Sequence, residues 1–478
     1  MYFSVFDLLK VGIGPSSSHT IGPMLAAKSF VDLLAQRGQL EQVVKLHVIL
    51  YGSLAYTGDG HGTFQAIILG LEGYEPTDVP LDRIKNRLRA LDSNPSLVLP
   101  DGHAIEFHNA DIERDTKRQR LYHPNTMEFN AWNSAGELLF SEEYYSVGGG
   151  FVQRKSELEK HSASDVRESH QQQSDKEPPY PFRDAKTLFQ LCRQHKLTVD
   201  QLMWANECSL RDQEEIRTKL DEIYRVMMEA IDRGLNSEGV LSGGLFIKKR
   251  AKSLINNLER LKQVVKNGHI RFTSHMTHSY LSAWALAVAE ENADFGRIVT
   301  SPTCGSCGVM PAVLRFYRDI ICQGKVEMDQ IYSFILTAGA IGLLFKHMAS
   351  ISGAEVGCQG EIGVAASMSA GALTAVCGGN FAQVESAARA SITHFLGLTC
   401  DPIKGLVQVP CIERNAIAAC QAVDVSQLAL IEQDPPGVFT LDQAIVTMKN
   451  TGLDIDPRYR ETSQAGLATL ELNNEEFV

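Results

Sequence analysis

A polar segment divides this chain into two parts of different composition. From residue 154 to 181 the sequence reads RKSELEKHSASDVRESHQQQSDKEPPYP and contains almost no large apolar side chain. Such a segment cannot offset the entropy lost on ordering by burying apolar surface, so it is predicted to be a linker. The chain should therefore fold as a multidomain protein, with one domain over residues 1–153 and another over residues 182–478.

The first part combines strand and helix signals. Strand patterns, two of them around an Asp-Gly turn, occupy residues 43–54, 96–108, 126–133 and 137–147. Helical patterns lie between them, at residues 22–36 and 81–91. Several short strands joined by tight turns and interrupted by helices are typical of an α+β domain with a mainly antiparallel sheet.

The second part is predicted to be all-α. Residues 184–207 and 211–232 place apolar side chains three and four positions apart, and strand signals almost vanish after Phe182. A run rich in Ala, Gly and Ser from residue 338 to 390 indicates helices that pack closely through small side chains.

Charge and composition narrow the class of partner. The 478 residues carry a formal net charge of −12, which argues against binding nucleic acid or an anionic membrane surface. No uninterrupted apolar run reaches the roughly 18 to 20 residues of a membrane span, and the start lacks a signal-peptide pattern. We expect a cytoplasmic protein that acts on a small molecule. In a reducing compartment its ten cysteines should be free thiols or metal ligands.

Three of these cysteines lie in irregular backbone. Cys358 stands among four glycines in SGAEVGCQGEIG, at residues 352–363, and Cys400 and Cys411 flank Pro402, Gly405 and Pro410 in CDPIKGLVQVPCIERN. Glycine and proline at this density disfavour a continuous helix. One interpretation is a helix contact through small side chains, with buried and inert thiols. The other is a metal or cluster site.

Two polar loops in the first part are candidates for substrate binding. Residues 14–23, GPSSSHTIGP, could surround an anion with hydroxyls and amides, although capping of a helix would explain one of the hydroxyls. Residues 58–64, GDGHGTF, place His61 on what we expect to be an exposed, flexible turn. A histidine there can be incidental, or it can carry a proton near pH 7.

Together these motifs resemble the bacterial iron–sulfur L-serine dehydratases, in the single-chain form with fused β and α domains. The matching stretches, in chain order, are SSSHTIGP, GDGHGTF, YHPNTM, YYSVGGGFV, GLNSEGVLSGGL, SGAEVGCQGEIG and DPIKGLVQVPCIERN. The resemblance implies a [4Fe-4S] cluster on Cys358, Cys400 and Cys411, and conversion of L-serine to pyruvate and ammonia without pyridoxal phosphate. A homodimer is our expectation, because symmetric pairs are the commonest soluble assembly.

The resemblance and the required chemistry suggest roles for further residues. An open iron of the cluster would be the Lewis acid, and His61 or His19 would be the base that removes the Cα proton. Ser16, Ser17, Ser18 and Thr20 would bind the substrate carboxylate. The remaining candidates for substrate binding are Gly60, Asn125, Glu355, Gln359 and Asn415. The tail from Asn473 to Val478 has no cysteine, so it cannot supply a fourth sulfur ligand.

Other interpretations stay open at this point. Cys304 and Cys307 form a C-x-x-C pair that could be a redox site or half a zinc site, although a packed loop near the active site is our preferred interpretation. The rival functions are a pyridoxal-phosphate lyase, an aconitase-like hydro-lyase acting on another small hydroxyacid, and a cluster-bearing amino-acid sensor.

Overall fold

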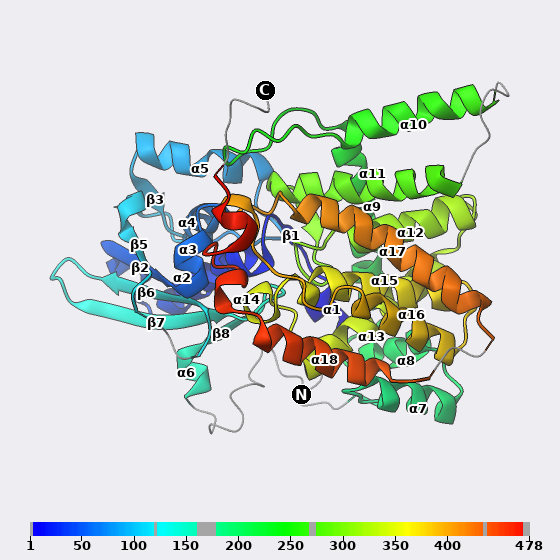
Figure 1. Ribbon diagram of the computed structural model, residues 1–478. Helices are drawn as coiled ribbons and strands as arrows, with labels where there is room; N and C mark the ends of the chain where they lie inside the picture. The colour runs from blue at the N-terminus through cyan, green and yellow to red at the C-terminus, as the bar shows by residue number, and fades with distance from the viewer. Residues whose placement is uncertain (1–2, 119–121, 160–177, 267–273, 434–436, 472–478) are drawn as a thin grey trace.

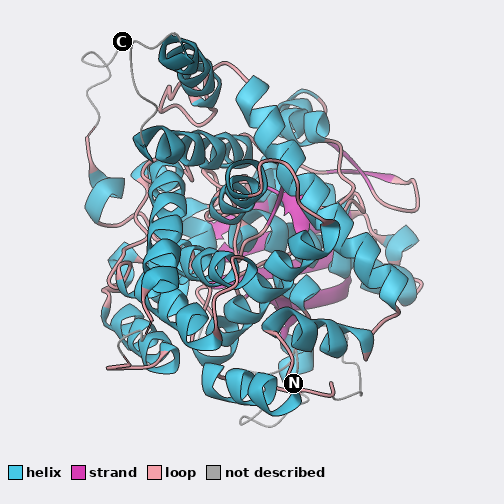
Figure 2. Ribbon diagram, turned by 90° about the vertical axis from the view of Figure 1, so that its right-hand side faces the viewer, coloured by secondary structure: helices cyan, strands magenta, loops and turns pink. Residues whose placement is uncertain are grey.

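The structure, a computed structural model, places an α+β part beside a helical part (Figure 1). It describes residues 3–118, 122–159, 178–266, 274–433 and 437–471. Seen from the helical side, the helices stand in front of the strands (Figure 2). This arrangement confirms the predicted fold class.

The main sheet of the first part has five strands in the order β5-β2-β6-β7-β8. Only the pairing of β2 with β5 is parallel. Every second residue of β2, including Leu46, Val48 and Leu50, is buried against helices α2 and α4. The strands are β2 (Lys45–Tyr51), β5 (Ile112–Asp115), β6 (Asn125–Trp132), β7 (Leu138–Ser146) and β8 (Val152–Arg154), and the helices are α2 (Gly22–Gln36), α3 (Gly52–Thr57), α4 (Thr63–Leu71) and α5 (Leu81–Ser93).

The predicted elements of this part are present, with one boundary corrected. The strands expected within residues 96–108 form the hairpin of β3 (Ser96–Val98) and β4 (Ala104–Glu106). The strand expected over residues 43–54 ends at Tyr51, because Gly52 has a φ of 54° and starts helix α3. That turn directs the chain toward the glycine-rich loop that carries His61.

The second part is a bundle of helices around a large apolar core. Its longest helices are α9 (Gln213–Asn236), α10 (Ala251–Lys266), α11 (Ser274–Ala293), α13 (Met328–Met348), α15 (Ile362–Val376), α16 (Phe381–Thr393), α17 (Cys411–Ile431) and α18 (Leu441–Asp454). The shorter ones include α7 (Ala185–His195), α8 (Val199–Cys208), α12 (Val309–Phe316) and α14 (Gly353–Val356). Helix α13 is long and apolar enough to cross a membrane, but 78% of its apolar window is buried inside the protein.

The start of the chain packs with the second part. Helix α1 (Val5–Leu8) belongs to the core of the helical bundle, and strand β1 (Val11–Ile13) pairs antiparallel with β9 (Arg297–Val299). This pair is the exception to the predicted all-α character of the second part. Three-residue strands are too short to produce a periodic signal.

The predicted linker is only partly within the described residues. Arg154 ends strand β8, and residues 155–158 form the short helix α6 (Lys155–Leu158), with Leu158 buried. Residues 160–177, on which the prediction mainly rests, lie outside the described residues, as does the tail from 472 to 478.

Candidate active site

Segments of both parts line one cavity. The first part contributes Pro15, Ser16 and His61. The helical part contributes Gly305, Cys358, Glu361, Ile362, Cys400, Pro402, Val407, Cys411 and Glu461. The three predicted ligand cysteines and one of the two predicted bases therefore face the same space.

The three thiols come from different local structures. Cys358 follows Gly357, whose φ of 75° and close approach to the Leu398 carbonyl leave no room for a side chain. Cys400 precedes Asp401-Pro402, and Cys411 is the first residue of α17. The ligand atoms of Cys358, Cys400 and Glu361 all lie within 4.8 Å of one another. This buried set of sulfur and oxygen donors could hold a metal.

The three thiols differ in their pKa values. A hydrogen bond from Cys400 lowers the pKa of Cys358 to about 6, against the opposing effect of burial and with support from the Arg414 guanidinium. The same hydrogen bond and burial raise the pKa of Cys400 well above its usual value, and burial does so for Cys411. Cys358 is therefore a thiolate near neutral pH and would be the first ligand available to a metal.

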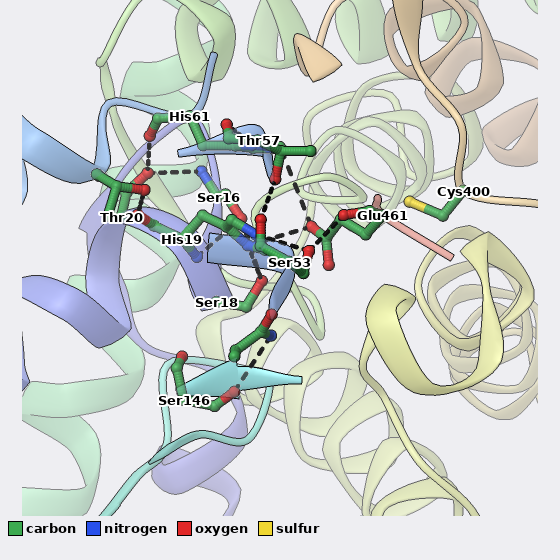
Figure 3. Close-up of polar contacts among 12 residues, drawn as sticks. Ser16, Ser18, His19, Thr20, Ser53, Thr57, His61, Ser146, Cys400 and Glu461 are labelled. Atoms are coloured by element: carbon green, nitrogen blue, oxygen red, sulfur yellow. Dashed lines mark hydrogen bonds and ion pairs between the residues drawn. The ribbon is translucent and has the colours of Figure 1, made fainter. Parts of the chain in front are cut away.

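His61 is held with one ring nitrogen free to accept a proton. Its Nδ1 lies 2.9 Å from the Thr57 carbonyl oxygen, which can only accept, so Nδ1 carries the proton and Nε2 has the lone pair (Figure 3). Burial lowers the pKa of His61 to about 4, so the ring is neutral near pH 7. The ring is 1% exposed, which corrects the prediction of an exposed turn. Gly62, with a φ of 66°, packs this turn against Phe295.

His19 stacks behind His61, with 4.5 Å between the ring centroids. Its Nδ1 lies 2.8 Å from Ser18 Oγ and its Nε2 lies 3.1 Å from Ser53 Oγ. Ser53 donates its own proton to the Glu461 backbone carbonyl, so His19 Nε2 must be the donor to Ser53. Both nitrogens are thus engaged, and burial lowers the pKa of His19 well below its usual value.

The serine-rich loop forms a π-helical turn, Ser17–Ile21, that is capped by Ser16. Ser16 Oγ accepts from the His19 amide, and Thr20 Oγ1 donates to the His61 carbonyl oxygen at 2.6 Å. Of the four predicted hydroxyls, Ser16 alone reaches the cavity wall among the described residues, while Ser17 is buried elsewhere in the turn. Thr20 and Ser18 hold the two imidazoles in place.

Comparison with known proteins now identifies the family. The family model for the serine dehydratase beta chain matches residues 4–157, and the one for the alpha chain matches residues 194–468. The L-serine dehydratase of Streptomyces coelicolor is 44% identical over 98% of this chain and 99% of its own. In Escherichia coli, L-serine dehydratase 1 is 43% identical and L-serine dehydratase TdcG 45%, each over 97% of this chain and 98% of the relative.

The chain belongs to the serine dehydratase family. The resemblance inferred from the seven motifs is therefore confirmed, and the beta and alpha regions of the family correspond to the α+β and helical parts of the fold.

The remaining predicted residues are not among those that line the cavity. Asn125 is buried at the start of β6, with Nδ2 3.3 Å from the Ser146 carbonyl oxygen and no partner for Oδ1 among the described residues. Glu355 lies 3.7 Å from His123, and its side chain is 41% exposed. Gly60 brings the His61 loop against the carbonyl oxygen of Gly405.

Gln359 and Asn415 support the cysteine loops instead of facing the cavity. Gln359 donates to the Val356 carbonyl oxygen and accepts from the Gly397 amide. Asn415 accepts from the Gly308 amide at 2.9 Å and donates to the carbonyl oxygens of Gly305 and Cys411. These bonds fix the backbone on both sides of the thiols.

The C-x-x-C pair is part of a packed loop. Cys304 and Cys307 are fully buried, and burial raises the pKa of each thiol. Cys304 Sγ lies 3.7 Å from the Ile13 carbonyl oxygen, and the Gly305 between the two cysteines lines the cavity. Inert, protonated thiols of this kind do not suit a redox pair.

Sequence reasoning missed Glu461. This residue lines the cavity, and burial together with the charge of Cys358 raises its pKa to about 8. It is a lone glutamate near the end of the chain, with no spacing that ties it to the other motifs. Only the fold brings it to the site.

Proposed function

We propose that this protein is an L-serine dehydratase that converts L-serine to pyruvate and ammonia with a [4Fe-4S] cluster bound by Cys358, Cys400 and Cys411. The observation that carries the proposal is the shared cavity, in which three buried thiols face an imidazole with a free Nε2. The names of the matched relatives support the choice of substrate.

The residues present fit such a cluster. Thiolate is the ligand that iron–sulfur clusters use, and three thiols converge on one enclosed space with a cation, Arg414, beside them. When bound, a cluster with three protein ligands supplies a Lewis-acidic iron that favours departure of the serine hydroxyl group. The site also contains carboxyl groups, which sulfur ligation does not require and which remain for other roles.

The chain's own residues would account for substrate binding and proton transfer. The Ser16 hydroxyl would hold the substrate carboxylate by a hydrogen bond. His61 Nε2 would accept the Cα proton, since the Thr57 carbonyl keeps the other nitrogen protonated and the ring correctly oriented. Loss of that proton and of hydroxide gives aminoacrylate, which tautomerises and hydrolyses in water to pyruvate and ammonia.

The rival chemistries have less support. A pyridoxal-phosphate lyase requires a Schiff-base lysine, and no lysine is among the described residues that line the cavity. An aconitase-like hydro-lyase for another hydroxyacid would share the thiols and the base but would not need to recognise an ammonium group. A cluster-bearing sensor would bind the amino acid without turnover.

The direct test is to purify the protein without oxygen and to measure iron, sulfide and pyruvate formation together. We expect the iron and sulfide of one [4Fe-4S] cluster per chain, no pyridoxal phosphate, and pyruvate from L-serine. Turnover of a hydroxyacid but not of L-serine would favour the hydro-lyase, and an intact cluster without turnover would favour the sensor. Sedimentation in the same buffer would test our expectation of a homodimer.

A further inference from the structure

Glu461 is fixed at the junction of the two parts by its backbone. Its amide donates to the Cys400 carbonyl oxygen at 2.7 Å, and the Cys400 amide donates to the Tyr459 carbonyl oxygen at 2.8 Å. On the other side, Ser53 of the first part donates to the Glu461 carbonyl oxygen. The residue has a φ of 59°, so the surrounding contacts hold it in a conformation that glutamate rarely adopts. The carboxyl group is therefore held in the cavity wall.

The two oxygens of the carboxyl group have different surroundings. Oε1 lies 3.4 Å from His19 Nδ1 and 3.9 Å from His61 Nε2. Oε2 is buried and has no hydrogen-bond partner among the described residues, and the side chain is 6% exposed. A buried carboxyl oxygen without a partner is costly, so this oxygen is a candidate to bind a ligand. Figure 3 shows Glu461 between the imidazole cluster and Cys400.

We propose that Glu461 binds the α-ammonium group of the amino-acid substrate. This inference rests on the proposed function, because it assumes that His61 takes the proton from the carbon that carries the ammonium. The ammonium nitrogen is bonded to that carbon, so its partner must lie close to His61 Nε2, as Glu461 does. A bound ammonium group next to Glu461 would favour the ionised form of its carboxyl group, and a carboxylate is the usual partner for an ammonium group in an enclosed site.

The other carboxyl group of the cavity is less suited to this role. Glu361 Oε2 lies 3.7 Å from Cys358 Sγ and 3.9 Å from Cys400 Sγ, so it faces the thiols. Glu355, which was predicted from the sequence, is half-exposed and pairs with His123. Glu461 would thus make the site selective for an amino acid over a hydroxyacid of the same length.

The test compares ligands that differ in one group. L-Alanine has the ammonium but no hydroxyl, and 3-hydroxypropanoate has the hydroxyl but no ammonium. In Glu461→Gln, which keeps the backbone contacts and the size, the KM of L-serine and the inhibition constant of L-alanine should rise roughly ten- to a hundredfold, the scale of a lost charged hydrogen bond. The inhibition constant of 3-hydroxypropanoate should stay within about twofold, since no ion pair is lost.

Controls separate this role from a structural one. Glu461→Asp keeps the charge and should keep a preference for L-alanine over 3-hydroxypropanoate. Glu106→Gln, a change on the exposed hairpin strand β4, should leave all three constants unchanged. The iron and sulfide content of Glu461→Gln should equal that of the wild type.

Three results would overturn the inference. The first is an equal rise in the inhibition constants of L-alanine and 3-hydroxypropanoate in Glu461→Gln. The second is loss of iron from that variant. The third is a selective loss of L-alanine binding in Glu355→Gln instead of Glu461→Gln. If the wild type does not dehydrate L-serine, the proposed function fails independently. Calorimetric binding of L-alanine and 3-hydroxypropanoate to wild type and Glu461→Gln would still decide whether Glu461 holds an ammonium group.

Discussion

At the scale of single residues, the protonation of the site follows from hydrogen-bond partners that can act in only one way. The Thr57 carbonyl fixes the proton of His61 on Nδ1. The Ser53 hydroxyl already donates to the Glu461 carbonyl oxygen, so it fixes the proton of His19 on Nε2. The two stacked imidazoles therefore have different surroundings. His61 has a free nitrogen toward the cavity, whereas His19 is bonded at both nitrogens.

This difference predicts which histidine is the base. His61→Ala should lower kcat for L-serine by roughly 10²-fold or more, the usual effect of removing a general base, and should leave iron and sulfide unchanged. His108→Ala, at a half-exposed ring on the outer surface, is the matched control and should have normal kinetics. A His61→Ala enzyme with near-normal kcat would assign the base elsewhere.

Individual residues were predicted from the sequence only where a local pattern marks them. Glycine- and proline-rich backbone surrounds Cys358, Cys400 and Cys411. Glycines flank the loops that contain His61 and Ser16, so each of these residues could be found by inspection. Glu461 and Ser53, 408 positions apart in the chain, could not. The exposure of His61 was predicted wrongly because a glycine-rich turn can also be packed tightly.

At the scale of elements, small residues allow the helices of the second part to pack closely. Gly234 of α9 lies against the backbone of α11, and a Cβ placed there would come within 2.2 Å of the Ala287 carbonyl oxygen. Backbone cannot move aside as a flexible side chain can. The two helices would have to separate to accept even one methyl group.

Gly234→Ala should therefore destabilise the protein by about 1–3 kcal/mol, the usual cost of overpacking. The measurement is the midpoint of thermal unfolding followed by circular dichroism. Gly437→Ala is the control, since a Cβ at Gly437 meets nothing within 4 Å, and its midpoint should equal that of the wild type. Equal midpoints for both variants would show that α9 and α11 can adjust.

Elements such as helices α2 and α9 and strand β6 were predicted from periodicity, because they are long enough to show it. Short elements such as α1, β1 and β9, which have only three or four residues each, were not predicted. Their pairing depends on long-range contact between the start of the chain and the helical part, for which no local pattern exists.

At the scale of the whole molecule, several buried imidazoles link stability to pH. Burial lowers the pKa of His61, His123 and His347 from 6.5 to about 4 in each case. Below pH 6.5 the unfolded chain binds protons that the native state binds only near pH 4. The contribution of these neutral imidazoles to the free energy of unfolding is complete above pH 6.5 and is lost as the pH falls toward 4.

We therefore expect the thermal midpoint to fall as the pH is lowered from about 7 to about 5. His347 lies in α13, away from the cavity, so His347→Gln removes one of these groups without touching the site. The variant should show a shallower fall than the wild type over the same range. A wild-type midpoint that is constant across this range would contradict the account.

The central claim is that three cysteines of the helical part hold an iron–sulfur cluster opposite residues of the α+β part. The most direct measurement is the iron and sulfide content of single cysteine variants purified without oxygen. Cys358→Ser, Cys400→Ser and Cys411→Ser should each lose iron, sulfide and pyruvate formation together, whereas Cys304→Ser and Cys307→Ser should retain the iron and sulfide of the wild type. Loss of the cluster in Cys304→Ser with its retention in Cys400→Ser would contradict the account.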